Sequence, residues 1–246
     1  MKGWHWPVVL GAALVALSAI LYFVHYLIFG DAHHIFIYMV GDVAFVPVEV
    51  LLVTLIIHRL LNERQKRSRM EKLNMVIGAF FSEVGTELLT MFSDFDPRLE
   101  EIRKSLAVTG DWTDQEFDSV NRRLRKYEYG IELSGVDLEA LRSFLMLRRD
   151  FLLRLLENPN VLEHESFTEV LRAVFHLSEE LTKRKSVRRL PESDFQHLTG
   201  DMRRVYVQLV HGWLDYMKHL KGDYPYLFSL AMRTNPFDES ATPVVA

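Results

Sequence analysis

Two carboxylates interrupt a long apolar stretch near the start of the chain. Asp42 and Glu49 are the only charged residues within residues 35–57. Their separation of seven residues places both side chains on one face of a helix. Acidic groups in a stretch of this kind are candidates for an ion or proton pathway, because they are costly to place in lipid. They can equally be protonated, hydrogen-bonded groups that help helices to pack, and the sequence leaves both interpretations open.

The preceding apolar stretch, residues 7–29, offers polar partners for these acids. Ser18 and His25 are seven residues apart and share one helical face, with Tyr22 beside them. If the chain folds back in the short turn between the two stretches, Tyr22 lies level with Asp42. We therefore predict a polar seam, formed within one hairpin or between copies of the chain. Its members are Ser18, Tyr22, His25, Asp42 and Glu49.

Both apolar stretches are long enough to cross a bilayer. A helix of about 20 apolar residues spans the roughly 30 Å hydrocarbon core, and we predict two such helices, at about residues 7–29 and 35–58. The turn between them is so short that the helices must be antiparallel. The first stretch continues past its cluster of small residues, so we interpret it as a retained helix and not as a cleaved signal peptide.

The second helix is predicted to be marginal as an isolated span. Each central acid costs roughly 2.5–3.5 kcal/mol on insertion, whereas each strongly apolar residue returns about 0.3–0.6 kcal/mol. The apolar residues around Asp42 and Glu49 roughly cancel two such charges. The helix therefore needs partners, and we predict that the protein forms a homo-oligomer in the lipid bilayer.

A basic cluster follows the second apolar stretch directly. The turn between the two helices contains no Lys or Arg, so the positive-inside rule places the turn outside and both termini in the cytoplasm. We predict an integral protein of a prokaryotic cytoplasmic membrane, with the cluster at the surface where anionic headgroups attract cations. The cluster consists of Arg59, Arg64, Lys66, Arg67, Arg69 and Lys72.

The rest of the chain has a different composition. Residues 1–58 contain one Lys, no Arg and three acids, whereas the remaining residues carry 28 basic and 30 acidic side chains. Because this remainder is nearly neutral, we expect no nucleic-acid partner. The chain has no cysteine, which excludes disulfides, thiolate metal sites and cysteine nucleophiles.

Motifs for cofactors and metals are missing from the sequence. No phosphate-binding glycine loop, zinc-protease motif or serine-hydrolase motif is present, so we predict no cofactor and no catalytic residue. Asp31, His33 and His34 are potential metal ligands. Three ligands in four residues do not easily converge on one ion, so we interpret them as a polar turn and predict no metal site.

One pair of residues does match a catalytic spacing. Arg204 and His211, with six residues between them, resemble the loose Arg-x(4–6)-His motif of HEPN-type ribonucleases, which are helical. The resemblance implies that these two residues would carry RNA cleavage. Val205 follows Arg204 where that family usually has a polar residue, and His211 lies near the presumed core face. A membrane-tethered HEPN-like ribonuclease is therefore a distant alternative.

Helical periodicity continues through the charged part of the chain. We predict an all-α protein: a two-helix transmembrane hairpin in residues 1–59, a cytosolic bundle of five to seven helices in 60–234, and a mobile C-terminal tail in 235–246. Good helix formers in 60–72 extend the second apolar helix beyond residue 58. Capping boxes are predicted at Thr113 and Ser166, and a helix start at Ser134 to Asp137.

These patterns favour a non-enzymatic integral membrane protein. Its hairpin would anchor a helical cytosolic domain that binds a protein partner or holds an oligomer together. The alternative is a homo-oligomeric ion or proton channel in which Asp42 and Glu49 line the path. Two helices alone cannot enclose a pore, so this alternative requires several copies.

Overall fold

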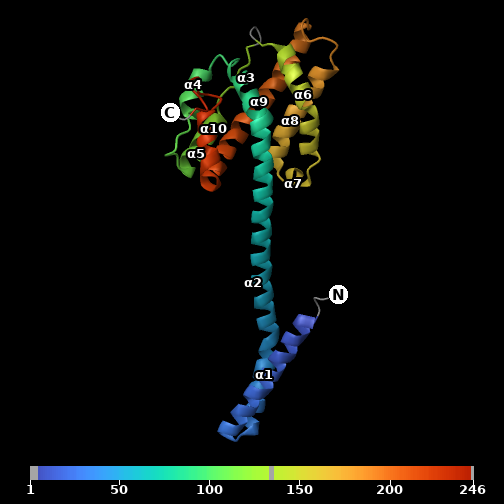
Figure 1. Ribbon diagram of the computed structural model, residues 1–246, viewed down its shortest axis with the longest axis vertical. Coiled ribbons are helices and arrows are strands. Elements are labelled where there is room, and N and C mark those ends of the chain that lie inside the picture. The colour runs from blue at the N-terminus through green and yellow to red at the C-terminus, as the bar shows by residue number, and fades with distance from the viewer. Residues whose placement is uncertain (1–4, 133–135, 245–246) are drawn as a thin grey trace. The chain divides into compact units, whose positions relative to one another are not determined.

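The structure is a computed structural model that describes residues 5–132 and 136–244, apart from the side chains of His5, Pro7 and Arg67 (Figure 1). Within these residues the protein is all-α, with 79% helix and no strand, which confirms the all-α part of the prediction. The chain divides into two compact units, Met1–Lys66 and Arg67–Ala246.

The first unit contains α1 (His5–Phe29) and the start of α2 (Ala32–Phe80), joined by a two-residue turn. Gly30 has a φ of +65°, a left-handed conformation that suits glycine, and its N–H donates to the carbonyl of Tyr26 at 2.9 Å. Asp31 then caps α2, because its side chain accepts from the backbone N–H groups of His33 and His34 at 2.9 and 3.2 Å. This cap explains why α2 begins three residues before the predicted position.

Both helices carry exposed apolar surface. By length and composition each is able to cross a membrane, and none of the most apolar window of either helix is buried. Leu51 and Ile56, for example, are more than half exposed. Beyond them α2 continues through the basic cluster, as the helix formers in residues 60–72 predict.

The second unit is a helical bundle that contains the end of α2 (Figure 1). Its longest complete helix, α9, packs against α8, α5, α3 and α10, and α6 packs on α8. The elements are η1, a π-helical turn (Phe81–Gly85), α3 (Thr86–Ser93), α4 (Leu99–Leu106), α5 (Asp114–Leu124), α6 (Leu138–Leu156), α7 (Pro159–Leu162), α8 (Glu165–Lys183), α9 (Glu192–Asp223) and α10 (Pro225–Arg233).

The described part of this unit has more helices than the predicted five to seven. One reason is the π-helical turn, which separates the end of α2 from α3. Another is α7, a single turn that Pro159 begins after Asn158 caps it.

The core of the second unit consists of apolar residues that recur at helical spacing in the sequence. Phe80 and Phe81 are both fully buried, and the Phe81 ring stacks on that of Tyr216 with 5.1 Å between centroids. Glycines allow this close approach of α2 and α9. A Cβ atom on Gly78 would lie 3.4 Å from the Tyr216 hydroxyl oxygen, and one on Gly212 would lie 3.5 Å from Phe81 Cζ.

The helix caps agree with the sequence in two places and differ in a third. Thr113 forms the predicted capping box with Glu116, and Asp137 caps α6. The predicted box at Ser166 is wrong, because α8 begins at Glu165 and its cap is His164, whose Nδ1 accepts from the N–H of Phe167. Ser166 is thus already inside the helix. The predicted start at Ser134 lies outside the described residues.

The first residues of the C-terminal segment that follows α10 contact the helical bundle. Asn235 is buried and donates through Nδ2 to the carbonyl of Leu106 at 2.8 Å, and the ring of Phe237 packs on that of Trp213. The segment that we predict to be a mobile tail thus begins with two residues that contact the bundle, and its mobility stays a prediction. Helical periodicity does not predict contacts of this kind, because they involve only the amide of Asn235 and the ring of Phe237.

Candidate functional site

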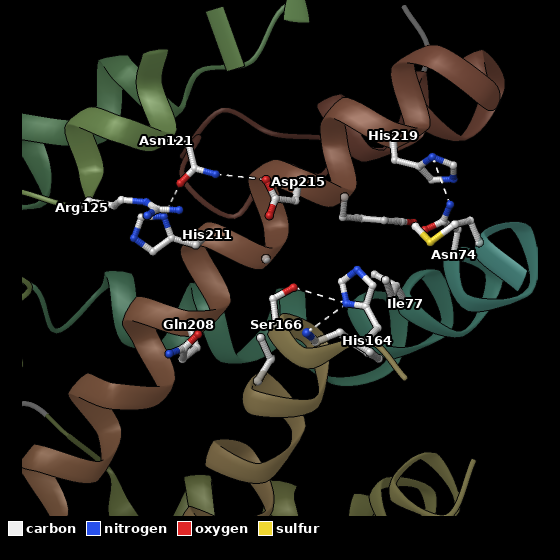
Figure 2. A pocket seen from close by; sticks show the side chains of 15 residues that line it. Asn74, Ile77, Asn121, Arg125, His164, Ser166, Gln208, His211, Asp215 and His219 are labelled. Atoms are coloured by element: carbon white, nitrogen blue, oxygen red, sulfur yellow. Dashed lines mark hydrogen bonds between the residues drawn. The ribbon is translucent and has the colours of Figure 1, made fainter. Parts of the chain in front are cut away.

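A cavity of 580 Å³ lies in the second unit, between the end of α2, α5, α8 and α9 (Figure 2). Its size is within the range of small-molecule sites. Ile77, Phe167, Val170 and Tyr216 contribute apolar surface. The polar side chains around it are Asn74, Asn121, Arg125, His164, Ser166, Gln208, His211, Asp215 and His219.

A hydrogen-bonded chain connects three of these polar groups (Figure 2). Asn121 Nδ2 donates to Asp215 Oδ1 at 3.0 Å, and His211 Nδ1 lies within hydrogen-bonding distance of Asn121 Oδ1. Because the carboxylate accepts only, it fixes the orientation of the Asn121 amide, and the amide oxygen then requires a proton on His211 Nδ1. In the neutral imidazole, Nε2 therefore keeps its lone pair and is a hydrogen-bond acceptor.

The surroundings of the chain determine its charge. Burial lowers the pKa of His211 below its ordinary value, and the positive charge of Arg125 lowers it further. Asp215 lies at the edge of the cavity, where removal of water by the surrounding protein raises the pKa of its carboxyl. His211 is thus a neutral acceptor at neutral pH, beside a cation and a carboxylate.

Arg125 is the cationic side chain of this cavity. It is exposed, it follows the last residue of α5, and among the described residues no carboxylate forms an ion pair with it. Arg184 shows the contrast, because its guanidinium binds both oxygens of Asp194 and also Glu180. The positive charge of Arg125 acts on the Asp215 carboxyl and lowers its pKa against the larger effect of burial, but no ion pair joins the two side chains, so the guanidinium donors are able to bind an anionic group.

The other histidines of the cavity have structural partners. His164 caps α8 and contacts the Ser166 hydroxyl, while His219 Nδ1 lies 2.9 Å from Asp223 Oδ2 and 3.2 Å from Asn74 Nδ2. Within residues 5–132 and 136–244, no three His, Asp or Glu side chains gather in a way that would hold a metal ion.

The polar seam predicted for the apolar helices is present in part. Tyr22 donates to Asp42 Oδ2 at 3.4 Å, and the His25 ring stacks on His34 with 6.1 Å between centroids. In the described part of the chain no hydrogen bond joins Ser18 to Glu49, although both are exposed. The structure thus brings Tyr22 to Asp42, whereas Glu49 has no hydrogen-bond partner among the described residues of the same copy.

The basic cluster lies along α2 on both sides of the division between the two units. Arg59 pairs with Glu63 one helical turn away, and Arg69 pairs with Glu163 at 2.9 Å. Arg64, Lys66 and Lys72 are exposed, and the Arg67 side chain lies outside the described residues. Several cations therefore remain on the helix surface.

The pair that resembles the ribonuclease motif lies on one helix, α9. Arg204 is exposed and pairs with Asp201 at 3.2 Å, whereas His211 lines the cavity. Seven residues of α-helix separate them by roughly 10 Å along the axis. The sequence analysis did not predict that His211 contacts Asn121 or that the charge of Arg125 acts on it. A sequence pattern that could have indicated this cluster is the four-residue spacing within each pair. This spacing places Asn121 beside Arg125 on one helix face and His211 beside Asp215 on another.

Comparison with known proteins divides the chain in a similar place. Residues 1–61 match the family described as the N-terminal helical domain of MJ1433, and residues 69–233 match that of its C-terminal helical domain. The chain is 44% identical to "Uncharacterized protein MJ1433" of Methanocaldococcus jannaschii over 241 residues, which cover 98% of this chain and 97% of the relative. No solved structure matches the chain.

Proposed function

Because the chain belongs to the MJ1433 family, in which an N-terminal helical domain precedes a C-terminal one, we propose that the first domain is a membrane anchor for the second. In this proposal residues 1–59 form a transmembrane hairpin, and the C-terminal domain is a non-enzymatic cytosolic domain that binds a partner or holds an oligomer together. One observation carries the proposal: the apolar windows of α1 and α2 are entirely unburied.

The two units of the chain differ in how far they bury their apolar residues. The helices of the second unit bury many apolar residues in a common core, as Leu145, Leu177 and Leu209 illustrate, although a few such as Leu147 are exposed. A core helix of a soluble protein would do the same. The hairpin instead leaves aliphatic side chains exposed around its circumference, which is the property of a helix that is solvated by lipid.

The two carboxylates support association between copies. Asp42 has Tyr22 as a partner, but Glu49 has none among the described residues of its own copy. A carboxyl group within an apolar span is stabilised when a second helix supplies a hydrogen-bond partner. We infer that Glu49 contacts another copy, so that the hairpin assembles as a homo-oligomer.

The mass of the purified, detergent-solubilised full chain tests this assembly. We expect an oligomer by light scattering, and we expect Glu49→Leu to shift the population toward smaller species because it removes the interhelical hydrogen bond. Val53→Leu, one turn further along α2, is the matched control and is expected to keep the oligomer. A wild-type monomer, or an oligomer that is indifferent to Glu49→Leu, would contradict the assembly through Glu49.

A channel remains the second candidate, and the same unpartnered Glu49 favours it. A carboxylate that several copies bring together would line a path for cations or protons. The channel predicts a ring of copies around an axial path and ion flux in liposomes that Glu49→Gln abolishes. A dimer without flux would leave the anchored interaction domain as the function.

A further inference from the structure

We propose that the cavity between α2, α5, α8 and α9 binds a small anionic ligand with a flat ring. Arg125 binds the anionic group, the acceptors of His211 and Asp215 bind hydrogen-bond donors on the ring edge, and apolar side chains contact the ring face. This site belongs to the C-terminal domain alone, so it does not depend on whether the first domain spans a membrane.

The charge of the ligand follows from Arg125. Its guanidinium lines the cavity without an ion pair to a described carboxylate, and it lies close enough to His211 to affect the protonation of that ring. Phosphate and carboxylate groups match the planar donors of a guanidinium in a bidentate arrangement. A neutral ligand would leave the donors of this guanidinium without an anionic partner.

The donors on the ligand follow from the Asp215, Asn121 and His211 chain. Asn121 fixes the proton of His211 on Nδ1, which leaves Nε2 as an acceptor in the neutral ring. Asp215 uses Oδ1 to accept from Asn121 and has a second oxygen that can accept from a ligand. An amino group or ring N–H satisfies such acceptors, whereas an aliphatic acid does not supply them.

The flat body follows from the apolar side of the cavity. Phe167 and Val170 come from α8 and Ile77 from α2, and Tyr216 is held by its stacking on Phe81. Gly212 adds no side chain to this surface. Because these groups are fixed by the core, the surface is pre-formed for a ring and needs little ordering when the ligand binds.

Two kinds of ligand share this chemistry, nucleoside monophosphates and amino-substituted aromatic carboxylic acids. Titration of the full chain in detergent with AMP, GMP and anthranilate, followed by ligand-observed NMR and calorimetry, distinguishes them. We expect saturable binding of at least one probe at pH 7.5. Binding of the nucleotides alone identifies a phosphate ligand, and binding of anthranilate alone identifies an aromatic acid.

Variants connect the binding to the proposed residues. Arg125→Gln is expected to lower the affinity for the bound probe about tenfold or more, because it removes a charge-assisted contact. Arg122→Gln, an exposed arginine on the same helix that does not line the cavity, is expected to leave the affinity unchanged. His211→Phe keeps a ring without the acceptor and is expected to weaken binding while the helical content stays the same.

Either of two results would overturn the proposal. One is the absence of saturable binding by all three probes at concentrations up to about 10 mM. The other is binding that Arg125→Gln and Arg122→Gln affect equally, because the anion would then be held by general surface charge. The far-ultraviolet circular dichroism of each variant shows whether it is folded, so that a loss of binding is assigned to the site.

Discussion

At the residue scale, His211 illustrates how neighbours on different helices determine the chemistry of one side chain. Asn121 and Arg125 from the end of α5 determine its tautomer and its charge, and Asp215 from its own helix orients Asn121. His211 alone, as it stands in the sequence, indicates only a polar group near an apolar face. The contacts make it a neutral acceptor in a cavity.

The lowered pKa of His211 predicts a pH dependence of stability. Because the folded state favours the neutral ring relative to the unfolded chain, His211 contributes stability above the ordinary histidine pKa of about 6.5 and loses it as the pH falls through the lower native pKa. Arg125→Gln removes one cause of the shift. We therefore expect the His211 pKa to rise in this variant and the loss of stability toward acidic pH to become smaller.

An NMR titration of the histidine ring protons measures this shift directly. The His211 resonance is identified by its disappearance in His211→Phe, and unfolding by urea at pH 7.5 and 5.5 gives the matching free energies. Arg122→Gln again serves as the control, because it removes a charge of the same sign outside the cavity. A His211 pKa that is equal in wild type and Arg125→Gln would show that Arg125 does not act on this ring.

At the residue scale the sequence predicts some contacts and misses others for a physical reason. The pairing of Tyr22 with Asp42 follows from counting residues on either side of a short turn, because two antiparallel helices fix the register. The proximity of Asn121 to His211 depends on how α5 packs against α9, ninety residues apart in sequence. Local spacing carries no information about such a pairing.

At the scale of elements, the helices follow from periodicity and their boundaries follow from capping. The capping box at Thr113 is local in sequence and is found by its pattern. His164 is not a usual cap, so the pattern at Ser166 predicts the wrong residue. The π-helical turn at Phe81 was not predicted, because helical periodicity does not distinguish a π-helical turn from the α-helix around it.

Substitution of two helical glycines by alanine is expected to change the stability of the domain in opposite directions. A Cβ atom on Gly85 would lie 2.6 Å from Phe81 Cδ1 and 3.0 Å from Phe80 Cε1, and both rings are buried. Gly85→Ala is therefore expected to destabilise the domain by about 1–3 kcal/mol. Gly200 is exposed within α9 with no atom near its Cβ position, so Gly200→Ala is expected to stabilise by about 0.5–1 kcal/mol.

Urea unfolding of the full chain in detergent, followed by far-ultraviolet circular dichroism and by tryptophan fluorescence, to which the buried Trp213 contributes, compares the two variants with wild type. The opposite signs are the informative result, because both substitutions add the same methyl group to a helix. Equal stabilisation by both would mean that the π-helical turn has room for a side chain, in conflict with the packing of Phe80 and Phe81.

At the scale of the whole molecule, the chain combines two helical domains with different surfaces. The C-terminal domain buries many apolar residues in a core and has a cavity with polar and apolar sides, whereas the N-terminal helices expose most of their apolar residues. Composition predicts this division, because the charged residues are concentrated after residue 58. It does not predict the cavity, which is built from four segments that periodicity treats separately.

The orientation of the hairpin is the claim on which the anchored function depends, and the absence of cysteine allows a clean measurement. A single cysteine at Ala32, beside the turn, or at Gly110, which has open space around its Cβ position, is labelled with a membrane-impermeant maleimide in intact spheroplasts and again after lysis. We predict that the Ala32→Cys chain is in the membrane fraction and is labelled from outside, whereas the Gly110→Cys chain is labelled only after lysis. Recovery of the full chain in the soluble fraction, or labelling of the Gly110→Cys chain from outside, would contradict the hairpin anchor.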